Sequence, residues 1–266
     1  MKINEIIREF FGYGGYKRAA EGSFSAEHLI FVTTLLAALA ALAVVLGLRN
    51  RRRSEKEKNR VLVAAAIAIN GFELIKIVSK CTEHGLREIL YLLPLFLCSV
   101  QLIAIPLAAL SKGRLREAAL DFIVIFGPLG ALLGTYAATQ NYNAYPVLSV
   151  DNVISGLTHA LAGFAAVYIM VSGMASMKRS NIPVTYAIIL SFCIPAYVMN
   201  HVVDYNYMFL VSGDGTPYDI LYNLVGGSKV LYPLGVVALF MLYITVFYQV
   251  YYLVQAARRR RRVRVR

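Results

Sequence analysis

Charged residues are scarce in this sequence. Only 16% of the 266 residues are Asp, Glu, Lys or Arg, and 58% are hydrophobic. A soluble globular domain usually carries about 25% charged residues. The mean hydropathy is correspondingly high, at +0.60. This shortage of charge excludes an ordinary soluble domain and predicts an integral membrane protein.

Several patterns typical of other protein classes are also missing. The three cysteines, Cys81, Cys98 and Cys193, offer no paired framework, so no disulfide scaffold is indicated. No two of the four histidines lie four residues apart, which is the helical spacing of many metal sites. Residues 1–28 contain no short apolar core with a small-residue cleavage site, so no secretory signal is expected there.

Long apolar runs dominate what is present. Seven of them are near or above the ~20 residues that a helix needs to cross a bilayer. They cover residues 29–48, 61–79, 88–110, 118–139, 152–172, 183–203 and 230–254. The predicted fold class is therefore all-α: one polytopic, seven-helix transmembrane bundle over residues 29–254, which leaves no room for a soluble domain.

The basic residues alternate between the connections. They concentrate in every second connection and in the tail: Arg49, Arg51, Arg52, Arg53, Lys56, Lys58, Arg60; Lys112, Arg114, Arg116; Lys178, Arg179; Arg258 to Arg262, Arg264 and Arg266. The remaining connections hold only Lys80, Arg87 and Lys229. Because Lys and Arg favour cytoplasmic loops, this alternation predicts a multi-pass protein of the cell membrane, with the N-terminus outside and the C-terminus in the cytoplasm.

The two ends of the chain are expected to meet the membrane surface. In the extracytoplasmic segment 1–28, Ile3, Ile6, Ile7, Phe10 and Phe11 recur at helical spacing, which predicts a short interfacial helix. The basic cytoplasmic tail, residues 255–266, is expected to contact anionic lipid headgroups rather than nucleic acid. The oligomeric state stays open.

The third apolar run, YLLPLFLCSVQLIAIPLAAL (91–110), contains unusual polar residues. Cys98 and Gln101 lie one turn apart in it, bracketed by Pro94 and Pro106. Each proline removes a helix hydrogen bond, so a kinked helix is expected. A thiol and an amide on one face indicate the wall of a site. The alternative is a packing kink with Cys98 as a small hydrophobic side chain.

Polar side chains gather in the outer halves of the predicted helices. Glu73 and Lys76 are three residues apart, so they share a helix face and can form an ion pair, with either a structural or a functional role. The other polar members are His28, Ser155, His159, Asn200, His201, Asn206 and Tyr207. The inner halves are almost bare. This asymmetry predicts a cavity open to the outer leaflet or to outer water.

Three kinds of function use the same residues. Cys98 and His159, at similar depth, suit a nucleophile and its base. His28, His159 and His201 could instead hold a metal ion with an aspartate, as in a metal-dependent lipid hydrolase. The third function is a non-catalytic transporter or ligand-binding protein, although the chain has no duplicated half of the kind that many carriers have.

Several short blocks carry a resemblance to a known family. The run LLPLFLCSVQLIAIPLA (92–108) resembles the proline-leucine-X-leucine-cysteine signature of the YwaF-like integral membrane proteins. Those proteins are similar to the lipid acyltransferase transmembrane protein 164. The supporting blocks are FSAEHLI (24–30), GFELIK (71–76), THALAGF (158–164) and NYMFL (206–210).

The resemblance implies a reaction and its residues. Cys98 would be the acyl-accepting nucleophile and His159 its base, and the acyl chain would pass between phospholipid and lysolipid in the outer leaflet. No bound cofactor is implied, and the partners are membrane lipids. The family usually has histidine where this chain has Phe96, and relatives often have two histidines where this chain has only His159. Both departures put the activity in question.

The charge alternation makes a direct prediction about topology. Single cysteines introduced between residues 50 and 60 should react with a membrane-impermeant maleimide only after the cells are permeabilised, because that connection is predicted to be cytoplasmic. A cysteine at residue 143, between the fourth and fifth predicted helices, should react in intact cells. Labelling of residues 50–60 from outside would reverse the orientation.

Overall fold

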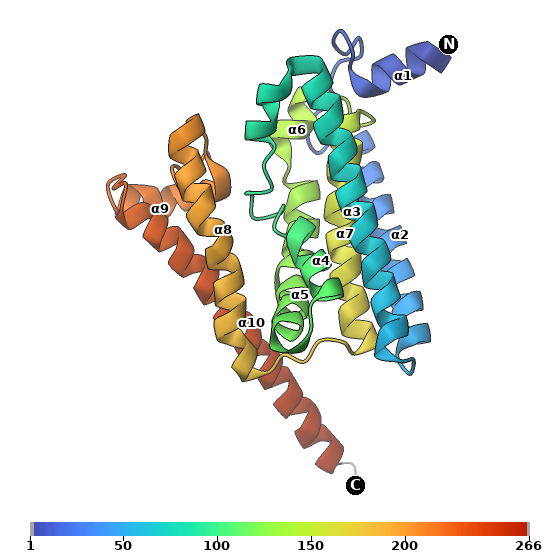
Figure 1. The fold of residues 1–266 in the computed structure, drawn as a ribbon, viewed down its shortest axis with the longest axis vertical. Helices are drawn as coiled ribbons and strands as arrows, with labels where there is room; N and C mark the ends of the chain where they lie inside the picture. The colour runs from blue at the N-terminus through green and yellow to red at the C-terminus, as the bar shows by residue number, and fades with distance from the viewer. Residues whose placement is uncertain (1–2, 265–266) are drawn as a thin grey trace.

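The computed structural model describes residues 3–264, all helices and connections with no strand among them (Figure 1). Residues 1, 2, 265 and 266, and with them Arg266 of the basic tail, lie outside the described part. The α-helices are α1 (Ile3–Phe11), α2 (Ala26–Asn50), α3 (Glu55–His84), α4 (Gln101–Leu110), α5 (Gly113–Tyr136), α6 (Thr139–Ala144), α7 (Val150–Ser172), α8 (Ile182–Val203), α9 (Tyr218–Leu224) and α10 (Leu231–Arg264). The 3-10 helices are η1 (Leu86–Tyr91), η2 (Arg179–Asn181) and η3 (Tyr207–Phe209).

Six of the described helices are long and apolar enough to cross a membrane. They are α2, α3, α5, α7, α8 and α10. Each coincides with one of the apolar runs found in the sequence, so the chain is a multi-pass helical membrane protein. The seventh, kinked helix expected over residues 88–110 is not present as one membrane-spanning helix.

Residues 86–110 are divided into three parts. The 3-10 helix η1 comes first, residues 92–100 form bends and turns, and only then does α4 begin, with ten residues. Pro94 lacks an amide hydrogen and disfavours helical geometry at Leu93, so a helix cannot run through this point without loss. The amide of Leu95 bonds instead to the carbonyl of Leu93 at 2.7 Å. Figure 1 shows this segment running beside α3 from the end of α3 to the start of α5.

The helices α2, α3, α5 and α7 form the main bundle, with α4 packed against α3 and α5. The tightest contact is between α5 and α7, and small residues permit it. A Cβ atom added at Gly127 would lie 2.7 Å from the carbonyl oxygen of Ala162, and one added at Gly163 would lie 2.7 Å from the Cβ of Ala131. Membrane helices often associate through such small residues, because close backbone approach increases van der Waals contact.

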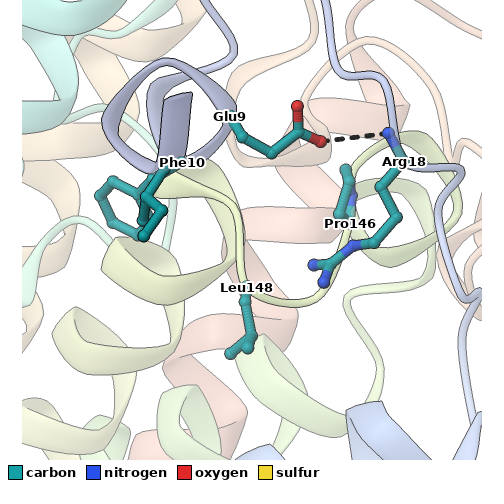
Figure 2. A pocket seen from close by; sticks show the side chains of 6 residues that line it. Glu9, Phe10, Arg18, Pro146 and Leu148 are labelled. Carbon is teal, nitrogen blue, oxygen red and sulfur yellow. Dashed lines mark hydrogen bonds between the residues drawn. The ribbon is translucent and has the colours of Figure 1, made fainter. Parts of the chain in front are cut away.

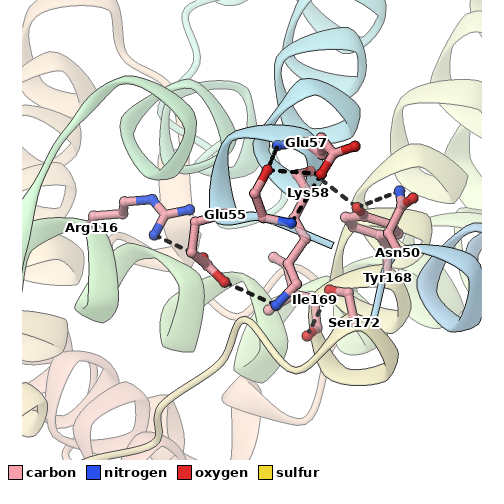
Figure 3. A network of polar contacts seen from close by, with 9 residues as sticks. Asn50, Glu55, Glu57, Lys58, Arg116, Tyr168, Ile169 and Ser172 are labelled. Atoms are coloured by element: carbon pink, nitrogen blue, oxygen red, sulfur yellow. Dashed lines mark hydrogen bonds and ion pairs between the residues drawn. The ribbon is translucent and has the colours of Figure 1, made fainter. Parts of the chain in front are cut away.

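Polar contacts tie the bundle together at the end where α2 meets α3 (Figure 3). The buried Tyr168 hydroxyl of α7 donates to the Lys58 carbonyl and accepts from the Asn50 amide, both at 3.0 Å. Glu55 pairs with Lys58 at 2.9 Å and with Arg116 of α5 at 3.6 Å. These contacts fix the relative positions of four helix ends.

The basic connections all lie at this same end. The α2–α3, α4–α5 and α7–α8 connections and the end of α10 gather at the bottom of Figure 1, whereas η1, α6 and α9 lie toward the top. The charge alternation in the sequence therefore corresponds to a segregation of basic residues in space. Which of the two ends is cytoplasmic stays a prediction.

Asp121 joins the second group of helices, α8 and α10, to the bundle. Its carboxylate, buried in α5, accepts hydrogen bonds from the Met177 amide at 3.0 Å, the Asn181 side chain at 2.7 Å and the Tyr248 hydroxyl at 2.9 Å. One side chain thus connects α5, the segment leading into α8, and α10. Three donors offset much of the cost of burying a carboxylate.

At the opposite end, aromatic rings connect η1 to η3. Tyr91 and Tyr205 have ring centroids 5.4 Å apart, and Phe96 and Tyr207 have centroids 4.9 Å apart. The Tyr207 hydroxyl also donates to the Leu90 carbonyl. The chain after α8 is therefore attached to the segment that leads to Cys98.

The predicted N-terminal helix is present as α1. Ile6 and Ile7 are exposed on it, and its Glu9 carboxylate accepts from the backbone amide of Arg18 at 3.1 Å (Figure 2). A surface hollow of about 300 Å³ lies between α1 and the segment containing Pro146 and Leu148. The exposed apolar face is compatible with the expected position at the membrane surface.

The Asp121 contacts predict a large effect on stability. Asp121→Ala leaves three donors without their acceptor, two of them on buried side chains, and should destabilise the protein by about 3–5 kcal/mol. Glu117→Ala is the matched control, because Glu117 lies one turn earlier on α5 and pairs with the exposed Lys178 at 2.7 Å. Its loss should cost about 1 kcal/mol or less. Thermal unfolding in detergent measures both, and equal effects would contradict the assigned role of Asp121.

Candidate functional site

Cys98 lies in the turn directly before α4, not within a continuous helix as expected. The turn covers residues 97–100, and the Val100 amide bonds to the Phe96 carbonyl at 3.2 Å. The thiol is half-buried, with its sulfur 4.0 Å from the Ser99 hydroxyl. The thiol therefore lies at the start of a short helix.

Gln101, the first residue of α4, is almost completely buried, but its side chain makes no hydrogen bond to the described residues. It is 1% exposed, and within the described chain neither its oxygen nor its nitrogen has a partner. Leaving a buried amide unpaired costs about 1–3 kcal/mol. A side chain in this condition is typical of a site that a ligand or water completes.

The expected ion pair between Glu73 and Lys76 is confirmed. Their charged groups are 2.7 Å apart on α3, with 12% and 21% of the respective side chains exposed. Both charged groups belong to α3 and lie one turn apart on the same helix face.

His159 extends from α7 toward α5. A Cβ atom added at Gly134 would lie 2.1 Å from the Cε1 atom of the imidazole, so the ring occupies the space above this glycine. The half-buried ring also has a polar contact with the backbone of Gly130. Ser155, one turn earlier on α7, is half-buried, and its carbonyl accepts from the Thr158 hydroxyl at 2.9 Å.

Cys98 and His159, the expected nucleophile and base, are not directly bonded to each other. Among the described residues no hydrogen bond joins Cys98 to His159. Catalytic hydrogen bonds are often long before substrate binds, so this geometry is compatible with a later approach of the two groups. Their direct pairing, and an outward cavity around them, stay predictions.

His28 is held by two backbone groups. Its Nδ1 accepts from the Phe24 amide at 2.9 Å, and its Nε2 donates to the Thr135 carbonyl at 3.0 Å. The ring is fully buried and stacks on Tyr142, with centroids 3.8 Å apart. Because both nitrogens are occupied by backbone groups, His28 fixes the start of α2 against the end of α5.

Three further predicted residues organise the chain after α8. Asn200 is buried, donates to the Tyr207 carbonyl at 3.0 Å and accepts from the Tyr207 amide at 2.6 Å. Asn206 donates to the Ser212 carbonyl at 2.9 Å. His201 is exposed, with its Nδ1 2.9 Å from the Tyr197 carbonyl on its own helix. Tyr207 reaches the Cys98 segment through Phe96 and Leu90.

The alternative metal site is not assembled in this arrangement. Among residues 3–264, no three His, Cys, Asp or Glu side chains come together in a way that could hold a metal ion. His28 is engaged by backbone groups and His201 is exposed, so the histidines of the sequence pattern serve separate places in the fold.

Sequence reasoning missed a second buried ion pair. Lys80 of α3 and Asp151 of α7 are 2.9 Å apart, with 11% and 8% of their side chains exposed. The Tyr16 hydroxyl donates to Asp151 at 3.2 Å, and burial together with the Asp151 charge raises the pKa of Tyr16. Opposite charges at the same ends of two predicted helices were a usable signal. No sequence pattern pointed to Gly134, because its contact with His159 depends on how a neighbouring helix packs.

Comparison with protein-family models found a match over most of the chain. The sequence model of the TMEM164 family matches residues 23–251, which include Cys98, His159 and the Glu73–Lys76 pair. Neither the search of curated proteins nor the search of solved structures found a match.

The contact between His159 and Gly134 can be tested through stability. Gly134→Ala should destabilise the protein by about 1–3 kcal/mol, since a methyl group there must displace the imidazole. Gly71→Ala is the control, because nothing lies within 4 Å of a Cβ at that helical position. It should be neutral or stabilising by up to about 1 kcal/mol. The Gly134→Ala/His159→Ala double variant should recover most of the loss in thermal unfolding, and additive losses would contradict the contact.

Proposed function

The chain belongs to the TMEM164 family, and from this membership and the position of Cys98 we propose that it is a lipid acyltransferase. Cys98 and His159 move an acyl chain between a phospholipid and a lysolipid in the outer leaflet of the cell membrane. One observation carries the proposal: a half-buried thiol lies in the interrupted segment directly before α4, three residues before Gln101, whose buried side-chain amide has no partner among the described residues.

The interruption supports a site over mere packing. Irregular backbone at membrane depth leaves amide and carbonyl groups without partners, which is tolerated only inside protein or beside a wet cavity. A thiol that served only as a small hydrophobic side chain would not require this break. The confirmed Glu73–Lys76 pair is also unusual inside a bundle and typical of functional positions.

The reaction proceeds through a thioester. His159 takes the proton of the Cys98 thiol, and the sulfur attacks the ester carbonyl of a phospholipid. The tetrahedral adduct collapses, the bond to the glycerol oxygen breaks, and that oxygen takes the proton from His159. The first lysolipid then leaves, and the acyl chain stays on Cys98.

The second half reverses these steps with another lysolipid. Its hydroxyl gives a proton to His159 while its oxygen attacks the thioester carbonyl. Collapse breaks the carbon–sulfur bond, and the Cys98 sulfur takes the proton back. Each proton and acyl group is accounted for by the two lipids and the two side chains.

The Glu73–Lys76 pair is suited to the lipid headgroup. A lysine ammonium binds phosphate as a compact charge, and its effect is strong where water is scarce. Glu73 holds this ammonium in position at 2.7 Å when no lipid is bound. In this role the pair orients the substrate so that its ester reaches Cys98.

Phe96 removes one possible proton-transfer group from the proposed site. It stands where relatives usually have histidine, and its ring packs on Tyr205 and Tyr207 with centroids 5.8 and 4.9 Å away. A phenyl ring transfers no proton. Proton transfer in this chain therefore depends on His159 alone.

The test is acyl transfer by the purified protein in lipid nanodiscs. Cys98→Ser should reduce transfer from a fluorescent phospholipid to a lysolipid by about 10³-fold or more, and His159→Ala should reduce it by about 10²–10⁴-fold. Intact-mass measurement should find an acyl adduct on the wild-type protein but none on Cys98→Ala.

Cys193→Ser is the matched control. This thiol is buried in α8, away from the proposed site, and its loss should leave transfer unchanged. Wild-type protein that forms no thioester, or transfer that survives in Cys98→Ser, would overturn the proposal. Transport of a solute that survives Cys98→Ala would instead support a non-catalytic transporter.

A further inference from the structure

We propose that the start of α4 is an oxyanion-binding site, in which the backbone amides of Cys98 and Ser99 and the side-chain amide of Gln101 donate to the substrate carbonyl oxygen. The inference deepens the proposed function and rests on it. It assigns a substrate-contacting role to Gln101 and a reason for the break before α4.

The amides before α4 are free. Within the described chain, the N–H groups of Phe96, Leu97, Cys98 and Ser99 donate to no other residue, whereas those of Val100 and Gln101 bond to the Phe96 and Cys98 carbonyls. The helix N-cap is Val100, whose apolar side chain makes no capping hydrogen bond. Free amides and the positive end of the helix dipole both favour a negatively charged oxygen here.

Gln101 supplies a second, independent observation. It is 1% exposed, and both of its side-chain polar atoms lack a partner. In a helix the Cα–Cβ bond tilts toward the N-terminus, and residues three apart share a face. The backbone amide of Gln101 bonds to the Cys98 carbonyl at 3.4 Å, so residues 98 and 101 have this helical spacing. Its side chain therefore extends over the turn that carries Cys98.

Asn200, a second buried amide among the predicted site residues, is already occupied. Both polar atoms of Asn200 bond to the backbone of Tyr207, at 3.0 and 2.6 Å. Freeing it would break the connection between α8 and η3. The side chain of Gln101 needs no such rearrangement, because its amide group has no hydrogen bond to break.

The chemistry requires donors at this position. When the Cys98 sulfur bonds to the ester carbon, the carbonyl π electrons move to the oxygen, which becomes negatively charged. Donors arranged beforehand around that oxygen stabilise the adduct, and removing one such donor typically costs about 10²–10³-fold in rate. On collapse the electrons return to the carbonyl, so the donors end as they began.

Two probes of the same thiol separate this role from packing. A lipid trifluoromethyl ketone adds to Cys98 and forms a tetrahedral adduct with a charged oxygen. Iodoacetamide alkylates the same sulfur by direct displacement of iodide and forms no such oxygen. Gln101→Leu should weaken ketone binding by about 10²-fold or more and leave the alkylation rate of Cys98 within about threefold.

Tyr232→Phe is the matched control. Tyr232 is also 1% exposed with an unpartnered hydroxyl, but it lies in α10. Its substitution should change neither probe. Gln101→Leu should also cut the rate of acyl transfer with little change in KM, because the donor acts on the transition state and not on the bound ester.

For Gln101→Leu, the unfolding temperature and the activity should not fall together. Because Gln101→Leu removes an unpaired buried amide, the variant should unfold at the same or a higher temperature than the wild type while losing activity. A purely structural glutamine would produce the reverse.

These experiments distinguish failure of the oxyanion assignment from failure of the acyltransferase proposal. If Cys98→Ser abolishes transfer but Gln101→Leu binds the ketone as wild type does, the oxyanion assignment is wrong and the acyltransferase stands. Equal loss with both probes also overturns it. If wild-type protein binds the ketone only as weakly as Cys98→Ala does, the thioester reaction itself is refuted.

Discussion

Much of this structure depends on one constraint, that backbone polar groups inside a membrane must find partners within the protein. Long helices meet it automatically, and six of them make most of the molecule. Residues 92–100 do not meet it, because Pro94 interrupts the hydrogen-bond series and α4 starts without a cap. The polar groups released by this break lie beside Cys98 and Gln101, so the least regular part of the chain is also where chemistry is possible.

The rest of the fold holds the interrupted segment, residues 92–100, in position. In the main bundle, Glu73 and Lys76 pair on α3, and Gly134 of α5 leaves room for the His159 imidazole. The second helix group is attached at both of its ends, through buried Asp121 at one and through the aromatic rings of η1 and η3 at the other. Two distant anchors of this kind hold a short, interrupted segment in one position.

Polar residues inside the bundle therefore divide into two groups. His28, Asp121 and Asn200 have all or nearly all of their polar atoms engaged by the protein, and they act as connections. Gln101 and the amides before α4 are unengaged among the described residues, which suits them to a ligand. Burial alone does not distinguish the groups, because all of these side chains are nearly or fully inaccessible; the presence or absence of a partner does.

The sequence by itself determined the membrane class, the positions of six long helices, the segregation of basic residues and the Glu73–Lys76 pair, because each depends on composition or on spacing within one helix. It did not determine that the run 88–110 breaks, since whether a proline kinks or ends a membrane helix depends on what neighbouring helices can satisfy. Nor did it separate the occupied His28 from His159 beside Gly134. Thr135, which accepts from His28, and Gly134, beside the His159 ring, both belong to α5, so only tertiary packing decides these contacts.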